Sequence, residues 1–159
     1  MKYFEFAEFY VRADIGHIGD IATVVGEVQP EVIFVDFIQH FGLPKSETRA
    51  LQLSEALRQL KSLAMTTKST MVVLSQVNRM SMTRSEKNPT LFDLKESGAL
   101  EEQGDIVILL HFPWKFDAGK SDSRLELRVE KNRHGPIGLI EIDFDLKSGR
   151  MKSYGATGR

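Results

Sequence analysis

A single segment, Val32-Ile33-Phe34-Val35-Asp36-Phe37-Ile38-Gln39, sets the fold expected for this chain. Its first four residues are apolar without alternation, which is typical of a strand buried on both faces, as in a parallel sheet. Such a strand delivers the next residue to the crevice at the carboxyl edge of the sheet, where open α/β sheets bind their ligands. The segment therefore predicts a buried parallel strand with Asp36 at a ligand-binding edge.

Asp36 is the first candidate for chemistry. A carboxylate at such an edge, with apolar walls behind it, can hold the water shell of a Mg²⁺ ion on a nucleotide phosphate. Gln76 follows the apolar run Met71–Leu74 in the same way. A neutral amide there can donate to a phosphate oxygen or hold an attacking water without competing for the metal. The alternative for both positions is a polar residue that closes a buried strand at a turn.

Composition bounds the class of protein. The chain has 159 residues, which suits one domain with a sizeable core. The net charge is -1, so any contact with nucleic acid must come from a local basic patch. There is no cysteine, which excludes disulfides and thiolate metal sites. Met1–Glu8 alternates apolar and charged residues and is neither a signal peptide nor a membrane span, so we expect a cytoplasmic protein without a membrane partner.

Two helices are expected before the second apolar run. Asp20 can cap a short helix that runs to about Val28, where Gln29-Pro30 ends it. Ser46 can cap a longer helix, whose apolar residues fall at helical spacing and indicate a face packed on a sheet. These apolar residues are Leu53, Leu57, Leu60 and Ala64.

Apolar runs and alternation predict the strands. Besides the first segment they are Tyr3–Val11, Met71–Leu74, Ile106–Leu110, Leu125–Glu130 and Leu139–Phe144. The last two flank the turn Asn132–Pro136 and predict a hairpin. The order of elements predicts an α/β fold with a largely parallel central sheet, flanked by helices and ending in this β-hairpin. The tail from Ser148 is polar and glycine-rich, and we expect it to be poorly ordered.

Two cations lie in the predicted hairpin turn, Lys131 and Arg133. Residues two apart on an extended strand point the same way. The pair could therefore clamp a γ-phosphate, with Arg as a rigid fork and Lys as a point charge. The alternative is a solvated turn with ordinary surface cations.

Four segments, taken in chain order, resemble the replicative ring helicases of the DnaB type. The segment from Val32 to Gln39 resembles their Walker B strand, and Leu74–Arg79 is similar to their sensor strand. Asp93–Glu102, a loop running into a short helix and then into Asp105-Ile106-Val107, resembles their DNA-contacting loop and the strand after it. Lys131–Gly138 resembles the turn that carries their trans-acting arginine finger.

The resemblance implies a RecA-like motor domain. In this family six copies form a hexameric ring around single-stranded DNA, and ATP with Mg²⁺ sits between neighbouring copies. By motif position, Asp36 would bind Mg²⁺ through water and Gln76 would sense the γ-phosphate. Lys131 and Arg133 would reach the phosphate bound by the adjacent subunit, so the expected partners are DNA and further copies of the chain.

The resemblance also implies a set of DNA-contacting residues. Lys95, Glu96, Ser97 and Gly98 would lie along the DNA backbone. Lys95 stands where many members carry Arg, which keeps the charge but loses the fork. The polar loop before them adds three more candidate cations, for which an ordinary solvated loop is the alternative. These cations are Arg79, Arg84 and Lys87.

The chain departs from the family in one large respect. No G-x-x-x-x-G-K-[ST] loop occurs in the 159 residues. We therefore expect residues 1–147 to be the carboxyl-terminal part of a motor domain, followed by a polar tail at 148–159. Such a chain could be a truncated piece, one half of a split gene, or a relic. By itself it is expected to be inert toward ATP, and its uncovered apolar strands favour self-association.

Two other classes of function remain open. One is a non-catalytic DNA-binding or assembly module that kept the fold after losing the nucleotide loop. The other is an ATPase related to RecA or to circadian-clock proteins, outside replication. The Gln-Val-Asn-Arg and Lys-Glu-Ser-Gly segments, at 76–79 and 95–98, favour the helicase over the latter.

Overall fold

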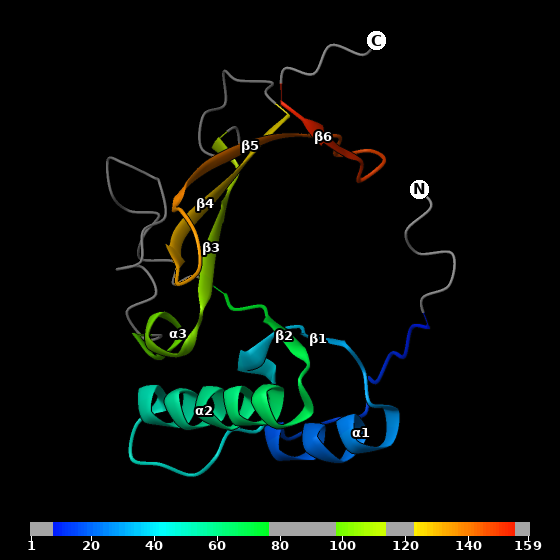
Figure 1. Cartoon of the computed structure of the whole chain (residues 1–159), viewed down its shortest axis with the longest axis vertical. Helices are drawn as coiled ribbons and strands as arrows, with labels where there is room; N and C mark the ends of the chain where they lie inside the picture. The colour runs from blue at the N-terminus through cyan, green and yellow to red at the C-terminus, as the bar shows by residue number, and fades with distance from the viewer. Residues whose placement is uncertain (1–7, 77–97, 114–122, 155–159) are drawn as a thin grey trace.

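A computed structural model of the chain describes residues 8–76, 98–113 and 123–154 (Figure 1). In chain order the elements are η1 (Ile18–Asp20), α1 (Ile21–Val28), β1 (Val32–Val35), η2 (Ile38–His40), α2 (Arg49–Thr67), β2 (Thr70–Val73), α3 (Gly98–Gln103), β3 (Ile106–His111), β4 (Arg124–Asn132), β5 (Gly138–Phe144) and β6 (Met151–Ser153). Strands and helices alternate at the start, and antiparallel strands follow at the end. The expected α/β class is thus what the described residues form.

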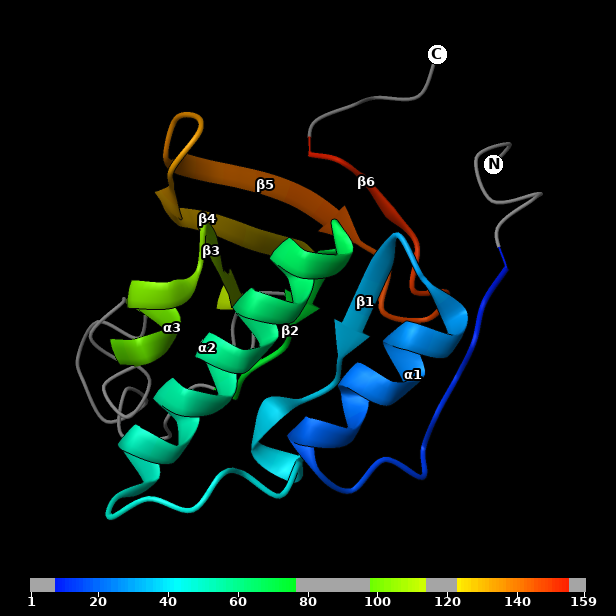
Figure 2. The ribbon, with the colours of Figure 1, turned by 60° about the horizontal axis from the view of Figure 1, so that its bottom comes forward.

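Strands β1 and β2 pair in parallel, with Val32 opposite Thr70 and Val35 opposite Val73. Helices α1 and α2 lie along one face of this pair (Figure 2). A parallel pair needs a crossover connection, and α2 supplies it between the two strands. The first segment of the chain therefore forms the parallel strand that its apolar run predicts.

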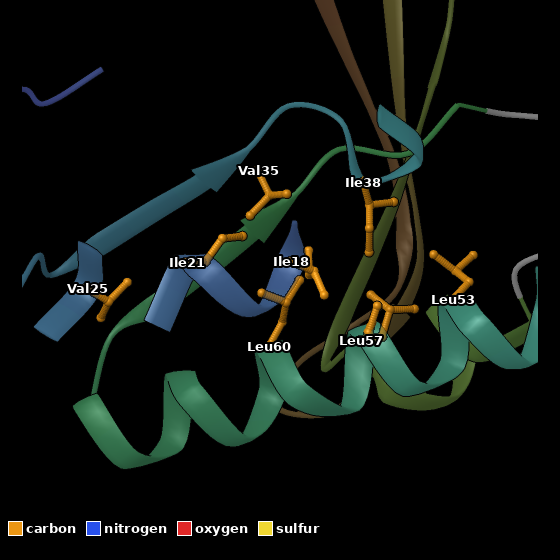
Figure 3. Close-up of a cluster of buried hydrophobic side chains, with 9 residues drawn as sticks. Ile18, Ile21, Val25, Val35, Ile38, Leu53, Leu57 and Leu60 are labelled. Carbon is orange, nitrogen blue, oxygen red and sulfur yellow. The ribbon is translucent and has the colours of Figure 1, made fainter. Parts of the chain in front are cut away.

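The core lies between this parallel pair and the helices (Figure 3). It consists of Ile18, Ile21, Val25, Val35, Ile38, Leu53, Ala56, Leu57 and Leu60. Ile38 has no exposed surface at all, so the turn after β1 is anchored as firmly as the strand itself. Of the α2 residues expected to face the sheet, Leu53, Leu57 and Leu60 are buried as the helical spacing predicts.

The expectation that β1 is buried on both faces is wrong for the described residues. Val35 is buried and Ile33 packs against the core, but Phe34 keeps 68% of its surface exposed. Val72 on β2 is exposed on the same side. Helices α1 and α2 cover one face only, and no other part of the described chain covers the second.

Strands β3 to β6 form a four-stranded antiparallel sheet in the order β3-β4-β5-β6. The predicted hairpin is confirmed as β4 and β5, with Leu127 opposite Ile140. Within the described residues, parallel pairing is confined to β1 and β2, and β3 joins the antiparallel sheet instead. The expectation of a poorly ordered tail is wrong at Met151–Ser153, because these residues pair with β5 as strand β6.

Three local expectations also need correction. Residues 8–16 form no strand, and the rest of the predicted strand Tyr3–Val11 lies outside the described residues. Asp20 stands at the N-cap of α1 but its side chain makes no capping hydrogen bond there, because the chain enters α1 from a 3-10 turn. Helix α2 begins at Arg49 and is capped by Thr48, not by Ser46. In the part of the chain that the structure describes, no helix is long and apolar enough to cross a membrane.

Candidate functional site

The residues that follow β1 and β2 are joined by backbone hydrogen bonds. The Leu74 amide donates to the Val35 carbonyl over 2.9 Å, and the Ile38 amide donates to the Leu74 carbonyl over 3.0 Å. These bonds extend the parallel pairing past the last strand residues. Asp36 and Gln76 therefore lie at one edge, the carboxyl edge of the parallel pair, and both are exposed.

Gln39 links the two segments through its side chain, and sequence reasoning missed this role. Its amide nitrogen donates to the Ser75 hydroxyl at 2.7 Å and to the Gln76 carbonyl at 3.5 Å. Its amide oxygen accepts from the backbone N–H of Gln76 at 3.3 Å. An amide side chain is both donor and acceptor, so it can bind a neighbouring backbone at two points. The available signal was its place three residues after Asp36, just past the strand end.

The carboxyl edge fits the outer part of a nucleotide site. Among the described residues, no three His, Cys, Asp or Glu side chains come together to hold a metal ion. A lone carboxylate at Asp36 suits a Mg²⁺ ion that keeps its waters and is carried by substrate phosphates. Nothing in the sequence supplies a loop of glycines and a Lys for those phosphates. The edge thus presents one carboxylate and one amide to solvent, which are groups able to contact a hydrated metal ion and a phosphate oxygen.

A pocket of about 290 Å³ lies elsewhere, between η1, α1 and α2. It is lined by Ile18, Gly19, Ala22, Arg58, Gln59, Leu60, Ser62 and Leu63. None of the candidate site residues is among them. The lining mixes apolar side chains with Arg58, Gln59 and Ser62, and no carboxylate is among them.

Lys131 and Arg133 point the same way, as their spacing predicts, and both bind the carboxyl end of α3. The Lys131 ammonium donates to the carbonyls of Glu101 and Glu102. The Arg133 guanidinium donates through Nη2 to the Glu102 carbonyl at 3.1 Å. The last carbonyls of a helix have no partner within it, and cations there also meet the negative end of the helix dipole.

A β-bulge decides which face these two cations take. The register between β3 and β4 shifts between Val107 and Ile108, so that Lys131 is opposite Val107 whereas Val129 is opposite Ile108. Glu130 is the extra residue on β4. Since side chains alternate along a strand, the extra residue moves Lys131 and Arg133 to the face that they would otherwise avoid. The bulge therefore turns both cations toward α3.

Asp105 holds Arg133 from the start of β3. Its Oδ1 accepts from Nη1 of Arg133 at 3.1 Å, and its Oδ2 accepts from the Lys61 ammonium of α2. The hydrogen bond from Lys61, with further attraction from Arg133 and His134, lowers the pKa of the Asp105 carboxyl below its ordinary value. Sequence reasoning used Asp105 only as the start of a strand motif. Its contacts join residues far apart in the chain, which no local pattern reveals.

The described chain thus holds two separate groups of candidate residues. Asp36 and Gln76 share the carboxyl edge of β1 and β2, while Lys131 and Arg133 bind α3. Within the described ranges, neither cation contacts that edge. Gly98 is the first residue of α3. The other candidate DNA-contacting residues lie outside the described residues; they are Arg79, Arg84, Lys87, Lys95, Glu96 and Ser97.

One known protein family matches this chain over most of its length. The family model described as DnaB-like helicase C terminal domain matches residues 18–153. A replicative DNA helicase DnaB of Mycobacterium leprae is 38% identical over 125 residues, 76% of this chain and 20% of that protein. DnaB of Buchnera aphidicola subsp. Acyrthosiphon pisum is 34% identical, over 77% of this chain and 27% of its own length. A probable plasmid replicative DNA helicase of Chlamydia psittaci is 32% identical, over 87% and 31%.

Solved structures agree with this match. One solved ATPase domain superposes with a TM-score of 0.81 at 27% identity, over 87% of this chain and 51% of that chain. A DnaB-like replicative helicase, whose structure was described with its interactions with primase, has a TM-score of 0.81 at 27% identity, over 89% and 36%. The chain therefore spans about half of one solved ATPase domain and between a fifth and a third of the curated relatives above.

Proposed function

Because this chain belongs to the family of DnaB-like helicase C-terminal domains, we propose that it forms part of the motor of a ring-shaped replicative DNA helicase. The motor couples ATP hydrolysis to translocation on single-stranded DNA and works in the cytoplasm, where that DNA lies. The fold is that of the family's RecA-like ATPase domains. Since the chain covers only part of its relatives, the complete activity belongs to the assembled motor.

The observation that carries this proposal is the edge shared by Asp36 and Gln76. Hydrogen bonds that Leu74 donates, and that Gln39 both donates and accepts, hold the two strand ends together at that edge. Open α/β sheets bind ligands at this place. In the proposed site, Asp36 binds Mg²⁺ through water, and Gln76 senses the γ-phosphate of ATP. The bound Mg²⁺ neutralises charge on the phosphates, while the chain's own residues orient and sense them.

Lys131 and Arg133 serve the site of a neighbouring subunit in this proposal. Lys131 lies near the end of β4 and Arg133 in the turn after it. Within the described residues both bind α3 rather than the edge that carries Asp36. A cation supplied in trans fits this separation. Arg133 stabilises charge on the transferred phosphoryl group, and Lys131 assists as a point charge.

A mixed-ring experiment tests the proposal. The complete motor joins this chain to the Walker A segment of a related helicase. In it, Arg133→Ala should lower kcat for ATP about a thousandfold or more while nucleotide still binds, because an arginine finger acts on the transition state. Arg58→Ala is the matched control, since Arg58 is an exposed arginine that pairs with Glu55 on α2.

Mixing then separates action in trans from action in cis. Rings that combine Arg133→Ala subunits with Asp36→Asn subunits should regain part of the activity, because some interfaces carry both intact residues. Full activity of the Arg133→Ala motor, or no recovery in any mixture, would contradict the proposal.

The proposal extends to DNA. Lys95, Glu96, Ser97 and Gly98 would follow the phosphate backbone, with Arg79, Arg84 and Lys87 as further cations. These residues include no aromatic side chain for stacking, so we expect contacts to phosphates rather than to bases. Lys95→Ala should weaken single-strand binding equally for all sequences and reduce the slope of log K against log salt by about one. A changed sequence preference at an unchanged slope would contradict this role.

A further inference from the structure

Asp105 has no part in the function proposed above, yet it is the carboxylate that touches Arg133. The contact from Nη1 of Arg133 to Oδ1 of Asp105 measures 3.1 Å. A second contact, from Nη2 of Arg133 to the Glu102 carbonyl, also measures 3.1 Å. Two acceptors at the two ends of a planar fork fix the orientation of that plane, which one acceptor would leave free to rotate.

These two contacts leave other N–H groups of the guanidinium free to bind a ligand. An arginine side chain carries five N–H donors in a fixed fork. Two of them are used by Asp105 and Glu102, so three remain. The Arg133 side chain is 49% exposed, and a ligand from outside the chain can reach these remaining donors.

Asp105 is itself held in place from three sides. The Lys61 ammonium of α2 donates to its second carboxylate oxygen. The backbone N–H of Arg133 donates to the Asp105 carbonyl at 2.9 Å, which ties the turn to the start of β3. The preceding residue, Gly104, leaves no room for a side chain, because an added Cβ would lie 2.8 Å from the Leu100 carbonyl oxygen. The carboxylate therefore stands on a rigid junction of α2, α3 and β3.

We infer that Asp105 is a positioning residue for Arg133, which it holds in the orientation that presents the remaining N–H groups to a phosphate of the neighbouring subunit. The inference rests on the proposed function, since it requires that Arg133 acts on such a phosphate. It adds a residue that acts through Arg133 and touches neither nucleotide nor metal. Exposed ion pairs such as Asp105–Arg133 add little to stability. Orienting the Arg133 guanidinium is therefore a better explanation for this pair than stabilising the fold.

Steady-state kinetics of the complete motor test the inference. Asp105→Asn keeps the shape of the side chain and removes its charge, so Arg133 loses a charge-assisted acceptor. We expect kcat to fall about tenfold to a hundredfold with KM for ATP unchanged, because a misplaced group costs rate at the transition state. Asp145→Asn is the matched control, since it makes the same change at a carboxylate between β5 and β6 that accepts from the Lys147 backbone N–H and the Ser148 hydroxyl, away from Arg133. Its kcat should stay near that of the unaltered motor.

A double variant separates positioning from a general structural effect. In the Arg133→Ala background, Asp105→Asn should cause no further loss of kcat, because the group that it positions is already gone. Asp105→Asn subunits mixed with Asp36→Asn subunits should recover part of the activity, as Arg133→Ala subunits do.

The outcomes distinguish the two ideas. If Arg133→Ala lowers kcat but Asp105→Asn matches the unaltered motor, the inference is overturned and the proposed function stands. Equal losses in Asp105→Asn and Asp145→Asn, or additive losses in the double variant, would also overturn it in favour of a general effect on the fold. If Arg133→Ala has no effect, the proposed function fails first and the inference falls with it.

Discussion

Asp105 directly precedes β3 and contacts Lys61 of α2 and Arg133 of the turn after β4. These cations lower the pKa of its carboxyl. Three cationic groups lower the pKa of the carboxyl from 3.8, with the Lys61 hydrogen bond as the largest cause and the charges of Arg133 and His134 after it. A lowered pKa in the folded state means that the ionised carboxylate favours folding above pH 3.8. That contribution is lost as the pH falls through the lowered value.

We predict that Lys61→Met raises the pKa of Asp105 toward 3.8 by more than Arg133→Gln does. The reason is that the hydrogen bond from Lys61 is the largest cause of the lowered pKa, whereas the charge of Arg133 is a smaller one. Carboxyl carbon NMR shifts followed during an acid titration of the chain measure both values. Asp145 serves as the internal control, because its pKa is lowered by Ser148 and neighbouring backbone groups that neither substitution touches. A larger rise in Arg133→Gln would contradict the assignment of Lys61 as the main partner.

Gln39 likewise makes contacts at the carboxyl edge of β1 and β2 that no local sequence pattern indicates. Its side chain bonds across to Ser75 and Gln76, residues that come 36 and 37 positions later in the chain. Neither the apolar run before it nor any short motif indicates this contact. The amide was visible in the sequence, but its partners were decided by the parallel pairing of β1 with β2.

At the scale of elements, the start of α2 shows how two adequate caps compete. Ser46 and Thr48 are both residue types that favour an N-cap. Thr48 has the extended backbone of a cap, with φ -129° and ψ 155°, and its hydroxyl accepts from the Leu51 N–H at 3.2 Å. Only the backbone carbonyl of Ser46 takes part, as an acceptor for Gln52.

We predict that Thr48→Ala lowers the free energy of unfolding by about 0.5–2 kcal/mol, which is the usual loss for a removed N-cap. Ser46→Ala is the matched control and should change it by much less, because its hydroxyl caps nothing in the helix. Chemical denaturation of both variants, followed by circular dichroism, measures the difference. Equal losses, or a larger loss at Ser46, would show that the helix begins earlier than Arg49.

The bulge in β4 decides on which face of the sheet Lys131 and Arg133 lie. It places Lys131 opposite Val107 after Val129 has taken the place opposite Ile108. Without it, simple alternation would put Lys131 on the same face as Leu127 and Val129. The spacing of the two cations predicts that they point together, and this is confirmed by their shared contacts with α3. The direction in which they point follows from the bulge.

At the scale of the whole molecule, the described chain has one well-covered layer and several uncovered apolar rows. Exposed apolar side chains occur on β1, β2 and β3; they include Val32, Phe34, Val72, Ile106, Ile108 and Leu110. Exposed strands with apolar rows are prone to pair with other chains. Self-association of the chain therefore remains a prediction, now supported by the exposure of these residues.

We predict that the chain of 159 residues binds Mg-ATP only weakly by itself. Asp36 and Gln76 reach the metal and the terminal phosphate, whereas most ground-state affinity in such sites comes from a phosphate loop with its Lys and hydroxyl. A single carboxylate holds a hydrated Mg²⁺ ion weakly. Calorimetric titration of the chain with Mg-ATP measures the affinity directly, and ADP with Mg²⁺ is the control for binding that ignores the γ-phosphate. A Kd in the micromolar range or tighter, about 8 kcal/mol or more, would reveal a nucleotide site not described above.

The sequence by itself determined the α/β class, the strand that delivers Asp36, the buried face of α2, the final hairpin and the family. These features follow from apolar periodicity, turn residues and motifs, all of which act between residues close in the chain. Only the tertiary structure decided that β1 is covered on one face, that residues 151–153 add a strand, and that Gln39 links the two strand ends. It also decided that Asp105 holds Arg133 and Lys61, which lie 28 and 44 positions away. Such contacts depend on how elements meet in space and on one extra residue in β4. No local pattern carries that information, because each choice is made by partners that are distant in the chain.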